Sequence, residues 1–226
     1  MAPMKPKAVV AWSSGKDCSY ALMSAMKSGD YDIIGLFATV TEQCQRIAMH
    51  DTRLSVIEKQ SAALGLELFT AHIPWPCNNE IYQNRMDAAY CDLRHHGIEV
   101  MIFGDLFLED VRHYRETQMT GCGITPVFPI WGHPTRALVC EMLDLGFDIR
   151  VVACDLKVLD PSFVGRQLDK QFLDDLPRNV DPCGENGEFH TVVLDMPLYK
   201  TAIPAHWGER HTRNGFAFAD LIPANI

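Results

Sequence analysis

Apolar and polar positions follow a repeating order along the first 150 residues of this chain. A short apolar run over 8–12 is followed by apolar residues at helical spacing between Cys18 and Met26, and then by Gly29. The same order recurs downstream and predicts alternating strands and helices. The predicted strands are 8–12, 33–40, 66–73, 99–103, 127–131 and 149–154, and the predicted helices are 18–26, 53–64, 79–96, 109–120 and 135–145.

Alternation of this kind, with nearly continuous apolar strands, is typical of a parallel sheet covered by helices on both faces. Because crossovers between parallel strands are right-handed, the pattern predicts a doubly wound, Rossmann-like α/β fold. Ligands of such sheets bind outside the carboxyl ends of the strands. The loops that follow the strands, at 13–18, 41–52, 74–78 and 104–109, are therefore the first places to search for a site.

The pattern changes after about residue 155. Asp160-Pro161 begins an expected helix that continues through Phe172, and residues 188–194 have the pattern of a strand. The tail from Pro197 shows little periodicity and predicts no further element. We expect two parts, a larger domain over 1–130 and a smaller C-terminal α/β subdomain over 131–226.

The charge balance restricts the class of partner. The 226 residues include 20 Lys and Arg against 29 Asp and Glu, a net charge of −9, and no five like charges are adjacent. Broad capture of a nucleic-acid backbone needs clustered cations, so no nucleic-acid partner is expected. Any phosphate must be bound locally, by backbone amides and one or two cations.

The cellular setting is predicted from two further features. The apolar run near the start is too short for a signal sequence, and no stretch approaches the roughly 20 apolar residues of a membrane span, so we expect a cytoplasmic protein without a membrane partner. The eight cysteines are at least 14 residues apart and form no C-x-x-C motif, which favours reduced core thiols over zinc ligands.

The strongest candidate for a phosphate site follows the first strand. Ser13, Ser14 and Gly15 lead from that strand into a helix, and Lys16 adds a full positive charge to the helix N-terminus. The chain lacks the glycine and the Ser or Thr that a Walker A loop needs, and it has no G-x-G-x-x-G fingerprint. The alternative is a simple strand-to-helix turn, with a serine as N-cap and Lys16 and Asp17 in solvent.

The residues resemble a known family. Ser13-Ser14-Gly15-Lys16-Asp17-Cys18 resembles the S-G-G-K-D-S loop of N-type ATP pyrophosphatases (PP-loop, adenine nucleotide alpha hydrolase-like proteins), which cleave ATP between the α and β phosphates. The segment 181–191 looks like the G-E-x-G-E-F-[HE]-T signature of one branch, the diphthine-ammonia ligase family. Gly104-Asp105, Arg112-x-Tyr114 and Pro129-x-Trp131 have the order and spacing of that branch, so the resemblance extends from about residue 8 to 196.

This resemblance implies a HUP-type fold that binds ATP with Mg²⁺ in the larger domain and a substrate in the C-terminal subdomain. The expected ATP-binding residues are Ser13, Ser14, Gly15, Lys16, Asp17 and Cys18, and the expected catalytic residues are Lys16, Asp105 and Glu188. Arg112, Tyr114, Gly184, Glu185, Glu188 and His190 are expected to bind substrate. Two departures from the loop, Ser14 for Gly and Cys18 for Ser, predict weaker nucleotide binding, and Ser14 is compatible with the cradle only at negative φ.

Several of these residues also have a purely structural interpretation. Asp105 follows a strand, where a carboxylate suits Mg²⁺ or serves as a helix N-cap. Arg112 has the spacing of a solvated, ion-paired helix face, and the functional alternative is that Arg112, Tyr114 and Arg115 approach an anionic group of the substrate. Glu188 and His190 share one strand face about 7 Å apart, which suits acid–base chemistry or a polar strand end. His50 has no partner at metal-ligand spacing and receives no role.

The function that the resemblance implies is an ATP-dependent ligase that adenylates a carboxylate, releases pyrophosphate and transfers ammonia. The acceptor is either a protein, a translation elongation factor, or a small carboxylic acid, and a homodimer is possible. An ATP- or AMP-binding regulatory module without turnover is the alternative from another class. Sulfur transfer to tRNA is disfavoured by the acidic charge and the scattered thiols.

Overall fold

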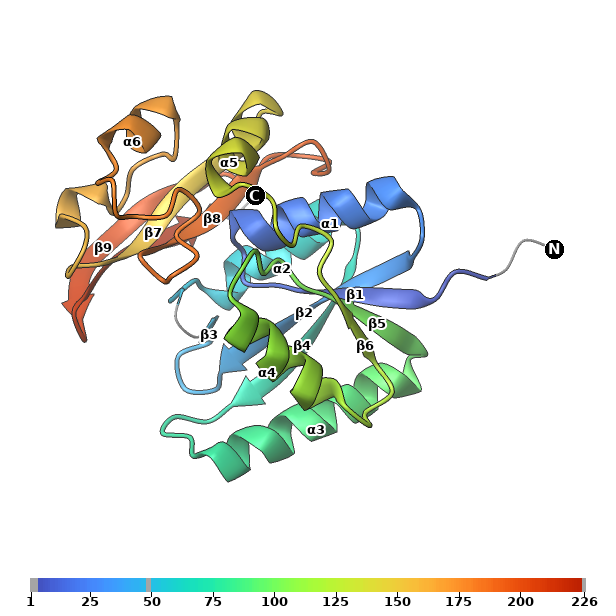
Figure 1. Cartoon of the computed structure of the whole chain (residues 1–226). Coiled ribbons are helices and arrows are strands. Elements are labelled where there is room, and N and C mark those ends of the chain that lie inside the picture. Colours follow the sequence, from blue (N-terminus) through green and yellow to red (C-terminus); the bar gives the residue numbers. More distant parts are fainter. Residues whose placement is uncertain (1–3, 48–49, 225–226) are drawn as a thin grey trace.

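The computed structural model describes residues 4–47 and 50–224, so residues 1–3 and 225–226, at the outer limits of the two predicted domains, lie outside the described residues. Its strands form two sheets (Figure 1). Sheet A contains β1 (Lys7–Ala11), β2 (Asp32–Thr41), β3 (Arg46–Ile47), β4 (Glu67–Ile73), β5 (Ile98–Ile102) and β6 (Thr125–Val127).

The strand order of sheet A reverses at β1. The parallel order is β4-β2-β1-β5-β6, and the short β3 pairs antiparallel with the end of β2. From β1 the chain moves to β2 and β4 on one side and then crosses to β5 and β6 on the other. The carboxyl ends of β1 and β5 therefore form a topological switch point, with the loops at 13–18 and 104–109 beside each other. The predicted doubly wound α/β fold is confirmed.

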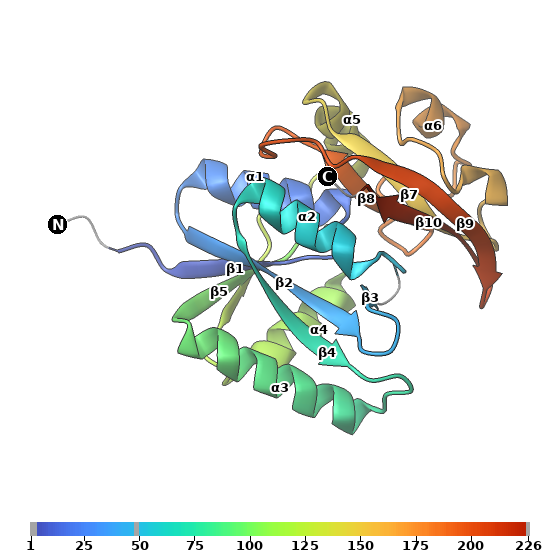
Figure 2. The same cartoon turned by 180° about the vertical axis from the view of Figure 1, so that it is seen from behind.

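Helices cover both faces of sheet A (Figures 1 and 2). Helices α1 (Lys16–Ser28) and α2 (Leu54–Leu64) lie on one face, and α3 (Asn79–His95) and α4 (Glu109–Met119) lie on the other. The pleat of β1 explains this division, because successive side chains point to opposite faces. Val10 packs in the core beneath α1, whereas Val9 packs in a second core beneath α3.

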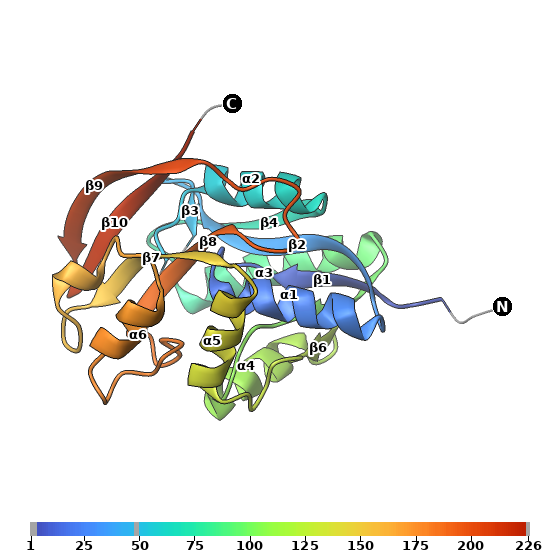
Figure 3. The ribbon, with the colours of Figure 1, turned by 90° about the horizontal axis from the view of Figure 1, so that it is seen from above.

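Sheet B is antiparallel and has the order β8-β7-β10-β9. Figure 3 shows it at the end of sheet A that faces away from the N-terminus. Helix α5 (Thr135–Asp144) leads into it, and a single 3-10 turn and helix α6 (Lys170–Asp175) connect β7 to β8. The strands are β7 (Asp148–Asp155), β8 (Phe189–Asp195), β9 (Ala205–Arg213) and β10 (Phe216–Pro223).

The two sheets share one apolar core. Val10 of β1, Leu22 of α1 and Val193 of β8 belong to the same cluster of buried side chains. At the edge of this core, Arg46 and Arg53 both bind the carboxylate of Asp220 on β10, at nitrogen–oxygen distances of 3.0 and 2.6 Å. Sheet B is thus fixed against the face of sheet A that carries α1 and α2. The division near residue 130 stays a prediction.

The single helix predicted from Asp160 through Phe172 is wrong. Only Pro161–Phe163 and Lys170–Asp175 are helical, and the residues between them lie along β7. Gly165, at φ +84°, donates its N–H to the carbonyl of Val151, and Gln167 forms a bridge with Arg150. Backbone pairing with β7 has replaced helical hydrogen bonds here, which apolar spacing alone does not reveal.

The expectation that the tail lacks regular structure is also wrong, because β9 and β10 form a long hairpin. Asn214 and Gly215, at φ +52° and +82°, make its turn, as an Asn-Gly pair commonly does. The strand predicted at 127–131 is displaced to Thr125–Val127, since Trp131 N–H turns back to the carbonyl of Phe128. No helix in the part of the chain that the structure describes has the length and apolar character required to cross a membrane.

Gly104 generates the first prediction. A Cβ on this residue, directly after β5, would lie 2.7 Å from the backbone of Asp17 and Cys18 in the first turn of α1. We expect Gly104→Ala to lower the free energy of unfolding by about 1–3 kcal/mol, because both crowded groups are backbone. Urea unfolding checks this, and a loss below about 0.5 kcal/mol with an unchanged slope would contradict the close packing.

Candidate functional site

The loop at 13–18 lies where β1 passes into α1. Gly15 is the N-cap of this helix of 13 residues and has no side chain that could cap it, whereas the N–H of Lys16 donates to Thr191 Oγ1. A helix N-terminus carries N–H groups without partners inside the helix and about half a positive charge, which together favour an anion. The phosphate-binding role of this loop stays a prediction.

Ser14 corrects one expectation about this loop. The loop was expected to suit a phosphate only if Ser14 had a negative φ. Ser14 instead has φ +76°, in the left-handed region that favours glycine. The backbone thus keeps the conformation that a glycine would adopt, although a residue with a Cβ bears a cost of about 1–2 kcal/mol there. Ser14 is fully buried, and neighbouring groups hold it in this conformation.

Lys16 is almost completely buried, with 2% of its surface exposed. Its ammonium group donates to Asp17 Oδ2 at 2.8 Å and to the carbonyl of Cys183, and it lies 5.5 Å from the ring centre of Phe189. Burial alone would lower the pKa of Lys16, but the charge and hydrogen bond of Asp17, together with the charges of Cys183 and Glu185, outweigh it and raise this pKa above its usual value. Lys16 is therefore an ammonium at neutral pH, and two of its three protons are used here.

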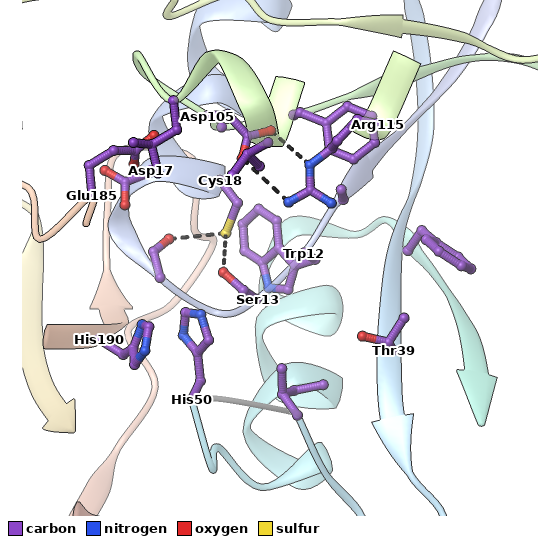
Figure 4. Close-up of a pocket in the computed structure, with 18 of the residues that line it drawn as sticks. Trp12, Ser13, Asp17, Cys18, Thr39, His50, Asp105, Arg115, Glu185 and His190 are labelled. Carbon is purple, nitrogen blue, oxygen red and sulfur yellow. Dashed lines mark hydrogen bonds and ion pairs between the residues drawn. The ribbon is translucent and has the colours of Figure 1, made fainter. Parts of the chain in front are cut away.

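Cys18 also belongs to this loop. Its thiol donates to the carbonyl of Gly15 at 3.1 Å and lies 3.7 Å from Ser13 Oγ (Figure 4). Burial raises the pKa of Cys18, which disfavours a thiolate nucleophile. The prediction of a core thiol agrees with this environment.

One cavity of about 570 Å³ joins this loop to the segment at 183–191. Its apolar part lies between the ends of β2 and β5 and helix α3, and its polar part lies at the loop and the start of β8. The apolar lining includes Phe37, Met86, Tyr90, Met101 and Phe103, and the polar lining includes Ser13, Lys16, Asp17, His50, Asp105, Arg115, Gln118, Glu185, His190 and Thr191. A pocket of this size and mixed lining suits a small organic ligand with charged groups.

Three carboxylates lie close together in the polar part (Figure 4). Asp105 is held by Arg115, with Nε–Oδ2 at 2.8 Å, and Glu185 accepts the N–H of Leu106 at 2.7 Å. Burial raises the pKa of Glu185 to about 7, and the charges of Asp17 and Asp105 add to this rise. Glu185 therefore titrates near neutral pH and can hold or release a proton there.

The same region was expected to hold Mg²⁺ on Asp105. Both oxygens of Asp105 accept from Arg115, whereas Asp17 Oδ1 is buried and has no hydrogen-bond partner among the described residues. Within residues 4–47 and 50–224, no group of three His, Cys, Asp or Glu side chains forms a complete metal site. Asp17 thus offers the freer oxygen, and a metal there needs oxygens from a ligand as well.

Two histidines stack in the polar part. The rings of His50 and His190 lie 4.3 Å apart between centroids, at an angle of 33° (Figure 4). Burial, together with the charge of Lys16, lowers the pKa of His190 to about 4, and burial with the charge of His190 lowers the pKa of His50. Both imidazoles are neutral at pH 7.

Four side chains that line the cavity have a buried polar atom without a hydrogen-bond partner in the described part of the chain. They are Asp17 Oδ1, His50 Nδ1, Gln118 Oε1 and His190 Nε2. Buried polar atoms are nearly always hydrogen-bonded in native proteins. Their gathering around one cavity makes it suitable for a polar ligand.

Glu188 does not line the cavity. Its carboxylate accepts from the backbone N–H of Asp181 and Asn186, both at 3.0 Å, and from Asn186 Nδ2 at 2.9 Å. These bonds close the loop that presents Gly184 and Glu185 to the cavity. The strand alternation placed Glu188 and His190 on one face, but the turn before β8 directs the carboxylate of Glu188 into its own loop.

Of the two arginines of helix α4 that were expected near the substrate, Arg115 lines the cavity and Arg112 does not. Arg112 binds Glu116 at 2.9 Å and stacks on Phe128 and Trp131, with its guanidinium carbon 4.9 and 4.8 Å from their ring centres. Tyr114 and Arg115 line the cavity instead. The roles assigned to Arg112 and Tyr114 stay predictions.

No role was assigned to His50, Gln118 or Thr191 from the sequence. Thr191 Oγ1 accepts the backbone N–H of Lys16 at 3.2 Å, a contact across 175 residues. Thr191 ends the segment 181–191, but nothing in that segment indicates a contact with Lys16. His50 lies in the strand-end loop 41–52, and this position was the signal that could have found it.

Two family models match the chain. The diphthamide synthase N-terminal domain matches residues 6–125, and the diphthamide synthase C-terminal domain matches residues 134–221. A bovine diphthine–ammonia ligase is 30% identical over 103 residues, which cover 43% of this chain and 39% of that protein. The human and mouse proteins of the same name are each 21% identical over 92% of this chain and 86% of their own length.

The depressed pKa of His190 generates a prediction about stability. The unfolded chain binds a proton at this histidine near pH 6.5, whereas the folded chain does so only near pH 4. Between these values the unfolded state holds more protons, so His190 makes stability fall as the pH falls. We expect the free energy of unfolding of the wild type, relative to His190→Gln, to decrease by roughly 2–3 kcal/mol from pH 6.5 to pH 4. Urea unfolding of both proteins across this range tests it, and a constant difference would refute the assignment.

Proposed function

This chain belongs to the diphthamide synthase family, and we propose that it is an ATP-dependent ligase that forms an amide from a carboxylate and ammonia. One observation carries the proposal. The phosphate loop at 13–18 and the signature segment at 183–191, which lie far apart in the sequence, line the same cavity. A nucleotide and a second substrate can therefore meet there.

The two parts of the cavity suit the two parts of ATP. Phe37, Tyr90 and Phe103 provide aromatic surface for the adenine. The N-terminus of α1 and Lys16 provide positive charge for the phosphates. This placement puts the α phosphate between the apolar part and the carboxylate-bearing polar part.

The proposed reaction has two steps. A carboxylate oxygen of the acceptor attacks the α phosphorus, the bond to the β phosphate breaks, and pyrophosphate leaves with the electron pair. The nitrogen of ammonia then attacks the acyl carbon, the bond to AMP breaks, and the nitrogen loses a proton. The protein contributes mainly orientation and electrostatic stabilisation, with Lys16 and the helix amides neutralising the leaving pyrophosphate.

Mg²⁺ fits this site as a companion of the phosphates. When bound, it supplies positive charge that offsets the polyphosphate. Asp17 and Glu185 are the carboxylates that we propose would hold it, because Asp17 Oδ1 has no hydrogen-bond partner among the described residues and Mg²⁺ prefers oxygen ligands. We propose that Asp105, with both oxygens bound by Arg115, orients that arginine at the edge of the site.

The signature segment has two roles in this proposal. Glu185 and His190 contact the acceptor or the ammonia, since both line the cavity and both have a displaced pKa. Glu188, which was expected to be catalytic, holds the loop that presents Gly184 and Glu185.

The acceptor is the open part of the proposal. The relatives are named diphthine–ammonia ligases, which favours diphthine on a translation elongation factor. A small carboxylic acid is the alternative. The departures of Ser14 and Cys18 from the loop of the family favour that alternative, but the glycine-like backbone conformation of Ser14 weakens this argument.

An assay for AMP separates the ligase from a regulatory module that binds ATP or AMP without turnover. Purified protein is incubated with ATP, MgCl₂, ammonium chloride and either diphthine-bearing elongation factor or a panel of small acids. Acceptor-dependent formation of AMP and pyrophosphate supports the ligase. Binding of ATP without AMP formation for any acceptor would favour the regulatory module.

We predict that Lys16→Ala abolishes pyrophosphate release, by at least about 100-fold, because it removes the cation at the leaving group. Lys27→Ala is the matched control, since Lys27 is an exposed lysine in the last turn of the same helix. Thermal unfolding is recorded in parallel, because Asp17 loses its partner in the variant. Lys16→Met serves if the smaller side chain prevents folding, and release at the wild-type rate from either folded variant would disprove the assigned role.

A further inference from the structure

Ser14 has an unusual combination of properties. It is a residue with a Cβ in the left-handed region, at φ +76°, and it is fully buried in the middle of the proposed phosphate loop. Such a conformation persists only when surrounding contacts determine it. The contacts that do so at Ser14 come from three separate parts of the chain.

Three hydrogen bonds fix Ser14. Its carbonyl accepts the backbone N–H of Val193 at 3.0 Å and Gln60 Nε2 at 3.1 Å. Its hydroxyl donates to Thr52 Oγ1 at 3.2 Å. A carbonyl oxygen has two lone pairs, and both are used by these donors.

Gln60 is the centre of this arrangement. It lies on α2 with no exposed surface, and it does not line the cavity. Its Oε1 accepts the indole N–H of Trp12 at 2.7 Å, while its Nε2 donates to Ser14 and to the carbonyl of Val193 at 2.9 Å. The side-chain amide of Gln60 thus binds Trp12 and Ser14, which flank Ser13, and also Val193 of β8.

We propose that Gln60 is a positioning residue for nucleotide binding, which holds Ser14 in the backbone conformation that a glycine would adopt unaided. In this way Gln60 keeps the amides of Gly15 and Asp17 directed at the phosphates without touching them. The inference rests on the proposed binding of ATP at the loop 13–18. The inference gives α2 a part in nucleotide binding, although Gln60 does not line the cavity.

The inference predicts a specific non-additivity. If Gln60 acts by holding a strained serine, replacing Gln60 weakens ATP binding only when residue 14 has a Cβ. Glycine adopts positive φ at no steric cost, so Ser14→Gly removes the need for the hydrogen bonds. A merely structural glutamine would instead show the same effect with either residue at position 14.

The experiment is a double-mutant cycle on ATP affinity, with Gln60→Met and Ser14→Gly alone and combined. Isothermal titration with ATP and MgCl₂ gives the dissociation constant of each folded protein. We expect Gln60→Met to weaken binding about tenfold with Ser14 and less than about threefold with the glycine. Gln171→Met, an exposed glutamine on α6, is the control and should leave the affinity unchanged.

The outcomes separate the inference from the function on which it rests. Equal losses of affinity in both backgrounds, or no loss in either, would overturn the role of Gln60 while leaving ATP binding intact. Absence of ATP binding by the wild type would refute the proposed function and the inference with it. If Gln60→Met does not fold, Gln60→Glu replaces it, because the carboxylate still accepts from Trp12 but has no amide protons for Ser14 and Val193.

Discussion

Two hydrogen bonds join β8 to the loop at 13–18, and the arrangement of the rest of the molecule depends on them. Val193 donates to the carbonyl of Ser14, and Thr191 Oγ1 accepts the N–H of Lys16. They fix the strand of one sheet against the turn of the other, at the end of β1 where a doubly wound sheet is open. The segment 183–188, which precedes β8, is consequently held over that opening. The cavity lies between this segment and the loop and extends to the ends of β2 and β5 and to helices α3 and α4.

Charge inside this cavity is balanced rather than simply positive. Lys16 and Arg115 face Asp17, Asp105 and Glu185, and each cation is already paired with a carboxylate. A bound polyphosphate would compete for the cations and release carboxylate oxygens, which then suit a divalent ion. A protein with a negative net charge can bind an anionic ligand in this way, because its few cations in the cavity are shielded from water and close to the ligand. The electrostatic attraction of each cation is stronger there than on the exposed surface.

Sequence reasoning succeeded where the signal is local and failed where partners are distant. The buried parallel strands, the helices and the loop at 13–18 follow from apolar runs, helical spacing and small residues. The hairpin of β9 and β10 was missed because β9 is mostly polar, although Phe216 to Ile222 of β10 form an apolar run interrupted only by Asp220, and Asn214-Gly215 marks the turn. The backbone conformation of Ser14 has no local cause, because it depends on tertiary hydrogen bonds to Gln60 and Val193. The orientation of Glu188 is local, since its carboxylate binds Asp181 and Asn186 in the same loop, but strand alternation does not reveal it.

The hydrogen bonds between β8 and the loop at 13–18 join residues that are far apart in the sequence. This separation affects how the protein folds during its synthesis. A ribosome releases the loop early, but its partners at 191–193 emerge only when most of the chain has been synthesised. Until then, Ser14 lacks the N–H of Val193, Lys16 lacks the acceptor Thr191 Oγ1, and the core shared by the two sheets is incomplete. A nascent chain therefore cannot present the finished loop and cavity, and the proposed binding of a nucleotide arises with completion of the fold rather than with the N-terminal half.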